Sequence, residues 1–100
     1  MPTKTKTRIK ELNFVVDIII EPDEKGFYAH SPALTGLMVD GETKEIALKN
    51  ARDGAIALLH SMVRDGDPIP LSIINPQPAS SIKVDPGAFF YKEAIKVVID

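Results

Sequence analysis

The sequence contains no cysteine, no long apolar run and no marked excess of charge of either sign. The absence of cysteine excludes disulfides, zinc–thiolate sites and thiol catalysis, and it fits a reducing compartment. No apolar run approaches the roughly 20 residues that a bilayer-spanning helix needs. The first eleven residues are mostly lysine, threonine and arginine, without the apolar core of a signal peptide. We therefore expect a cytoplasmic protein that does not enter a membrane.

The composition is that of one ordinary globular domain. The 100 residues are 44% hydrophobic and 26% charged, with a formal net charge of −2. Basic residues alternate with threonine and isoleucine in residues 1–11, a pattern open to two readings, a nucleic-acid-binding arm or a flexible basic tail. We favour the tail. Because no basic face is concentrated elsewhere, we expect no direct DNA binding.

Residues 14–43 carry the most regular pattern in the chain. Residues 14–21 alternate as a strand, and one side is wholly apolar, formed by Phe14, Val16, Ile18 and Ile20. The opposite side is half apolar, formed by Val15, Asp17, Ile19 and Glu21. The first side is expected to face a helix. The second is expected to be covered in part by the C-terminal segment or by another subunit.

A hairpin and a third strand follow in the pattern. Pro22 closes the first strand, and Gly26 can take the positive φ of a hairpin turn over residues 22–26. Residues 27–30 then form the return strand, and residues 37–39 a short third strand.

A single long helix is predicted from residue 44 to about residue 64, with Thr43 as its N-cap and Gly66 at its end. At 100° per residue one face of this helix is apolar. Its members are Ala47, Leu48, Ala51, Ala55, Leu58, Leu59 and Met62. Gly54 inside the helix costs about 1 kcal/mol relative to alanine, so a tight packing contact is expected there.

The remainder of the chain is rich in proline, with short strand candidates at residues 71–74 and 81–84 within an irregular extension, residues 71–93. Residues 94–99 form the strongest late strand, expected at an edge of the three-stranded meander. The prediction is an α+β domain. A three- to four-stranded, mainly antiparallel sheet in β-β-β-α-β order packs on one long helix.

The central stretch resembles the HicB-like antitoxins, the partners of HicA toxins. Members of that family typically show a strand ending in Glu-Pro-Asp, a Gly-aromatic return strand, a Pro-x-Leu-Pro-Gly crossing and a Gly-Asp/Glu-Thr helix start. The matching residues here are 20–24 (IEPDE), 26–29 (GFYA), 32–36 (PALTG), 41–43 (GET), 45–48 (EIAL), 50–52 (NAR) and 65–70 (DGDPIP). The resemblance covers about residues 14–70. Thr35 and Leu37 depart from it, standing where the family often has proline and cysteine.

The resemblance implies a partly degraded ribonuclease H-like fold and a non-enzymatic role. Family members cover the active site of a small basic, mRNA-cleaving HicA-like toxin, and many append a helix-turn-helix or ribbon-helix-helix domain that binds operator DNA. Residues 67–100 hold five prolines and no pair of amphipathic helices, so that DNA-binding domain is expected to be absent. The chain then corresponds to a solitary form of the module.

Candidate binding residues are the carboxylates expected at the turns and helix start, together with two ring side chains. Such carboxylates would complement a basic partner and steer its approach, although solvated turn and cap residues would look the same in sequence. The partner-binding set is Glu21, Asp23, Glu24, Tyr28, His30 and Asp40. The set expected at a homo-oligomer interface, dimer or tetramer, is Val15, Ile19, Val97 and Ile99.

Two other classes stay open at this point. A residual ribonuclease H-like nuclease would use Asp17 and Glu21 with Mg²⁺ or Mn²⁺, but they stand ~13 Å apart along a strand, far from a two-metal spacing of about 4 Å. The other is an orphan structural homo-oligomer. His30 and His60 lie on different elements, and no serine or glycine-rich motif marks a nucleophile or a phosphate loop. We expect no catalytic residue, metal site or cofactor.

Overall fold

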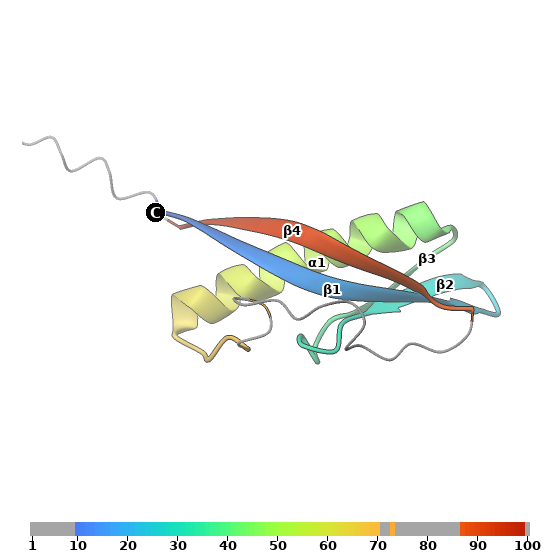
Figure 1. Cartoon of the computed structure of the whole chain (residues 1–100), viewed down its shortest axis with the longest axis horizontal. Coiled ribbons are helices and arrows are strands. Elements are labelled where there is room, and N and C mark those ends of the chain that lie inside the picture. The colour runs from blue at the N-terminus through green and yellow to red at the C-terminus, as the bar shows by residue number, and fades with distance from the viewer. Residues whose placement is uncertain (1–9, 71–72, 74–86, 100) are drawn as a thin grey trace, which may run out of the picture.

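The computed structural model describes residues 10–70, 73 and 87–99 (Figure 1). The elements are β1 (Lys10–Asp23), β2 (Gly26–His30), β3 (Met38–Gly41), α1 (Lys44–Asp65) and β4 (Phe89–Ile99). The four strands form one antiparallel sheet in the order β3-β2-β1-β4. The predicted α+β fold, with β-β-β-α-β order and one long helix, is confirmed. The last strand lies at an edge of the meander, as expected.

The two longest strands lie side by side. Residues Lys10–Ile20 of β1 pair in register with β4, from Lys10 opposite Ile99 to Ile20 opposite Phe89. This pairing makes both strands longer than the sequence pattern suggested. Residues 10 and 11, expected in the tail, belong to β1, and residues 89–93, expected in the irregular extension, belong to β4. The ladder hydrogen bonds of a partner strand extend each strand past its own alternating pattern.

The strand predicted at residues 71–74 is wrong at Ile73. The Ile73 N–H donates to the carbonyl of Pro70 over 3.1 Å, which is a helical turn, and its side chain is 1% exposed. The rest of that prediction, the strand predicted at residues 81–84 and the tail up to residue 9 lie outside the described residues.

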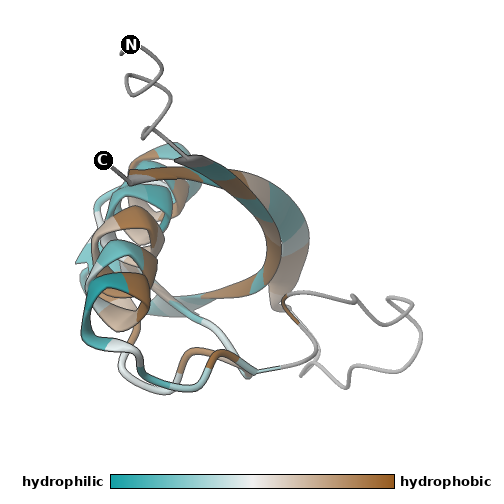
Figure 2. Ribbon diagram, turned by 90° about the vertical axis from the view of Figure 1, so that its left-hand side faces the viewer, coloured by the Kyte–Doolittle hydropathy of each residue, from teal (hydrophilic) through white to brown (hydrophobic). Residues whose placement is uncertain are grey.

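The sheet curves round α1, as Figure 2 shows. Phe14, Val16, Ile18 and Ile20 of β1 are buried on the side facing the helix, as their alternation predicted. The core is completed by Ala29, Leu34, Leu37, Ala47, Ala51, Ala55, Leu59, Ile73, Ile95 and Val97. The helix contributes three alanines to this list. Their small side chains let its axis approach the sheet closely.

Both ends of α1 are capped as the sequence predicted. The Thr43 hydroxyl oxygen accepts a hydrogen bond of 3.1 Å from the Ile46 N–H. At the other end Gly66 has a φ of 75°, and the Asp67 N–H donates to the Met62 carbonyl over 2.9 Å. Within the described residues no helix is long and apolar enough to cross a membrane.

Two glycines mark the tightest contacts between the helix and the rest of the fold. A Cβ on Gly54 would lie 2.9 Å from Leu37 Cδ1, so the Leu37 side chain packs directly on the helix at this glycine and would have to shift for a larger residue. A Cβ on Gly41, the last residue of β3, would lie 2.5 Å from the backbone nitrogen of Ala47. Backbone cannot move aside as a flexible side chain can, so the close approach of β3 to α1 requires glycine at position 41.

We expect Gly41→Ala to destabilise the fold by about 2–3 kcal/mol, because the added methyl group overpacks against helix backbone. The measurement is urea unfolding followed by circular dichroism. Gly36→Ala is the matched control, since its Cβ would meet nothing nearer than Leu58 Cδ2 at 3.8 Å. Equal unfolding midpoints for the two variants would contradict the close approach.

Candidate protein-binding surface

The candidate site lies on the outer face, which we define as the side of the sheet turned away from α1. Cross-strand partners share a face. The residues of β2, β3 and β4 on the outer face are therefore those that the register places in line with alternate residues of β1. The members with described side chains are Glu11, Asn13, Val15, Asp17, Ile19, Glu21, Asp23, Tyr28, His30, Met38, Asp40, Phe90, Lys92, Ala94, Lys96 and Val98. The face therefore combines apolar, aromatic and charged side chains.

Three predicted partner-binding residues form one cluster on this face. His30 Nε2 lies 2.7 Å from Glu21 Oε2, and the His30 ring stacks on Tyr28 with centroids 5.6 Å apart and planes at 21°. Glu21 and Tyr28 are direct cross-strand partners. All three side chains are half-buried. The cluster thus places two stacked rings on the outer face, and a hydrogen bond to the Glu21 carboxylate holds the His30 ring.

Asp17 is buried in the outer face and forms an ion pair. Its Oδ1 lies 2.8 Å from the Nζ of Lys92, its direct cross-strand partner, and the two side chains are 10% and 33% exposed. The Lys92 ammonium also lies 5.6 Å from the centroid of Phe90. The nuclease alternative needed Asp17 and Glu21 free to bind ions, whereas both are engaged by basic side chains. Among the described residues no three ligands gather as a metal site would need.

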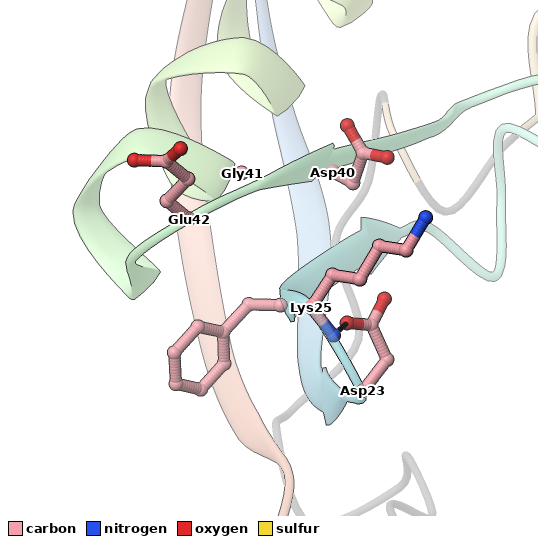
Figure 3. Close-up of a pocket in the computed structure, with 6 residues that line it drawn as sticks. Asp23, Lys25, Asp40, Gly41 and Glu42 are labelled. Carbon is pink, nitrogen blue, oxygen red and sulfur yellow. Dashed lines mark hydrogen bonds between the residues drawn. The ribbon is translucent and has the colours of Figure 1, made fainter.

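The remaining predicted carboxylates stand at the end of the sheet formed by the hairpin turn and β3. Asp23, Lys25, Phe27, Asp40, Gly41 and Glu42 line a hollow of about 300 Å³ (Figure 3). The Asp23 carboxylate accepts a 2.8 Å hydrogen bond from the Lys25 N–H and so stabilises the turn. In Figure 3, Asp40 and the end of the Lys25 side chain lie toward the right of the view, and Glu42 lies toward the left. Glu24 is exposed in the turn.

Of the residues predicted at an oligomer interface, Val15 and Ile19 share the outer face and Val97 does not. Val15 is half-buried on the outer face, and Ile19 lies on that face but is only 5% exposed. Val97 faces α1 and is 1% exposed in the core, so it cannot serve an interface on the outer face. The side chain of Ile99 lies outside the described residues. The residue that stands opposite Val15 is the exposed Ala94.

Sequence reasoning missed Met38, Phe90 and Lys92 as outer-face residues. Met38 is 68% exposed and lies directly opposite His30. Phe90 lies opposite Ile19, on the other side of β1 from His30. An alternating pattern is weak in these short or mixed stretches, and only the strand register places them in one row.

Comparison of the chain with models of known families, with curated proteins and with solved structures finds no significant match.

We expect Lys92→Met to destabilise the fold by about 1–2 kcal/mol, because it leaves the Asp17 carboxylate buried without its cation. The double variant Asp17→Asn with Lys92→Met should recover part of the lost stability. A double-mutant cycle with stabilities from urea unfolding measures this coupling. Lys49→Met is the control, since the Lys49–Asp53 pair is 74% and 62% exposed and is worth under about 0.5 kcal/mol. A Lys92→Met effect no larger than the control's would show that the pair contributes nothing.

Proposed function

We propose that this chain is a non-enzymatic, HicB-like protein-binding module of the antitoxin type. Its partner would be a small basic, mRNA-cleaving HicA-like toxin, neutralised when this chain covers its RNA-binding site. The observation that carries the proposal is the make-up of the outer face near β2 and β3. There the stacked Tyr28 and His30 rings and the exposed Met38 stand beside the carboxylates of Glu21, Asp23 and Asp40.

The chemistry of this face suits a basic protein surface. Aromatic side chains and methionine supply large contact area and are common anchors of interfaces. Carboxylates around them complement cationic side chains and raise the rate of encounter. A protein that binds RNA must present basic groups to phosphates. A surface that pairs those same groups with carboxylates therefore competes directly with RNA, and no catalytic step by this chain is needed.

The test begins with a pull-down from nuclease-treated lysate of the native host, read by mass spectrometry. We expect recovery of a small basic RNA-binding protein in stoichiometric amount. Reconstituted from purified components, the complex should lose the partner's RNA-cleaving activity at equimolar ratio. Recovery of this chain alone, or a partner whose cleavage activity is unchanged in the complex, would reject the antitoxin role.

In that complex, Tyr28→Ala should weaken binding by about 2 kcal/mol, or roughly thirtyfold, because it removes an aromatic anchor and its stacking on His30. Isothermal titration calorimetry measures the affinity, and circular dichroism checks that the variant is folded. Lys49→Ala, on the exposed side of α1, is the control and should bind as the original chain does. Equal affinities for the two variants would place the interface elsewhere.

We also propose that the chain self-associates through the β1–β4 part of the outer face, where Val15, Ala94 and the 47% exposed Val98 lie. Light scattering should give a mass of at least a dimer at micromolar concentration. Val15→Lys should return it to 10.9 kDa, because a lysine there places a charge in the contact. A monomeric mass for the unmodified chain would remove this proposal and leave partner binding untouched.

A further inference from the structure

The strand β3 lies at an edge of the sheet and is paired on one side only. Its partner is β2, and among the described residues no strand lies on its other side. The free side of an edge strand presents N–H and C=O groups that can template another strand. The Asp40 carbonyl already accepts a hydrogen bond of 2.8 Å from the Asn50 side chain. The part of the edge left for an added strand therefore lies before this carbonyl, from the Asp40 N–H back to Met38.

A hollow lies on each side of this edge. The one on the outer-face side has a volume of about 570 Å³ and is lined by Asp23, Tyr28, Met38, Val39 and Asp40. The other, of about 370 Å³, lies between β3 and α1, where Met38 and Val39 line it together with Gly36, Leu37, Gly54, Ala57, Leu58 and Ser61. The two hollows differ in chemistry. The first carries two carboxylates, and the second is almost wholly apolar.

We propose that the free edge of β3 binds an extended segment of a partner protein as an added strand whose residues alternate between apolar and basic. Successive side chains of a strand point to opposite faces. One set would therefore enter the apolar hollow beside α1, and the other would meet the carboxylates of Asp23 and Asp40. Main-chain hydrogen bonds supply affinity in strand addition, and the hollows for alternate side chains supply specificity.

The two carboxylates have charge to offer a ligand. Among the described residues no basic side chain forms an ion pair with Asp23 or Asp40, and both residues are exposed. An acidic segment would meet repulsion on this side, and a segment with basic residues at every position would place charge in the apolar hollow. The inference rests on the proposed function only in taking the partner to be a basic protein.

The experiment is an NMR titration of the full ¹⁵N-labelled chain with the capped peptide Thr-Val-Lys-Val-Lys-Val-Thr. Its control has the same composition in the order Thr-Val-Val-Val-Lys-Lys-Thr, which breaks the alternation. We expect the alternating peptide to shift the amides of Met38, Val39, Gly54 and Ala57 and to bind about tenfold more tightly than the control, a difference of about 1.4 kcal/mol. Intermolecular nuclear Overhauser contacts should join its backbone to β3.

Two variants separate the two hollows. Asp40→Lys should weaken the alternating peptide about tenfold through repulsion, and replacing both peptide lysines with glutamate should restore binding to this variant. Ala57→Phe should abolish binding by filling the apolar hollow. Asp65→Lys and Lys49→Phe make similar changes at exposed positions of α1 that line neither hollow, so they should leave the affinity unchanged.

Equal binding of the two peptides, or shifts confined to Tyr28 and His30, would overturn strand addition at β3 and leave the antitoxin proposal standing. Conversely, edge binding in a chain that captures no basic toxin would retain this inference and reject the antitoxin role. A third probe is the peptide of residues 2–10, which alternates threonine with lysine or arginine over most of its length. If it binds more tightly than the valine–lysine peptide, the occupant is a second copy of this chain and the partner assignment is wrong.

Discussion

The antiparallel pairing of β1 with β4 is the constraint on which the rest of the molecule depends. It joins segments from near the two ends of the sequence over Lys10–Ile20. On the side facing the helix it sets Phe14 beside Ile95, and on the outer face it sets Asp17 beside Lys92. A slip of one residue in this pairing would exchange the two faces of β4. Lys92 would then face the core, and Ile95 and Val97 would lie on the outer face. The partly buried ion pair and the hydrophobic core therefore specify the same register.

The helix packs close to this sheet because the residues between them have small side chains or none. Alanines line the buried side of α1, Gly54 receives Leu37, and Gly41 lets the end of β3 meet the backbone at Ala47. Such close contact raises packing density and leaves little tolerance for added atoms. It also fixes the position of β3 relative to the helix. The apolar hollow beside β3 is a consequence, since its far wall is the helix surface around Gly54 and Ala57.

The outer face divides into two regions with different chemistry. Over β1 and β4 it combines apolar residues, among them Val15, Phe90 and Val98, with ion pairs within the chain. Those pairs are Asp17 with Lys92 and Glu11 with Lys96. Over β2 and β3 it is aromatic and acidic. In the first region the charges are largely neutralised internally, which favours contact with a like surface. In the second, Asp23 and Asp40 form no ion pair among the described residues. Their negative charge is available to a basic partner, so the two proposed contacts can coexist on one sheet.

The sequence by itself determined the local elements and the direction of their faces. These local features are the alternation in β1, the Thr43 cap, the apolar face of α1 and the helix end at Gly66. Each depends on neighbours within a few residues, so each can be predicted from the sequence alone. Several carboxylates of the candidate site could be named in the same way, because turn and cap residues are local signals. The same reasoning failed for Val97, which it placed at an interface although it is in the core.

Only the tertiary structure decided which residues of distant segments stand opposite one another. The lengths of β1 and β4, the pairing of Asp17 with Lys92 and the row of Met38, His30, Ile19 and Phe90 all follow from strand register. Register depends on contacts between residues up to 89 positions apart, as for Lys10 and Ile99, and a short or mixed pattern such as residues 89–93 fits more than one pairing. Local propensity cannot choose among them, whereas burial of one common core can.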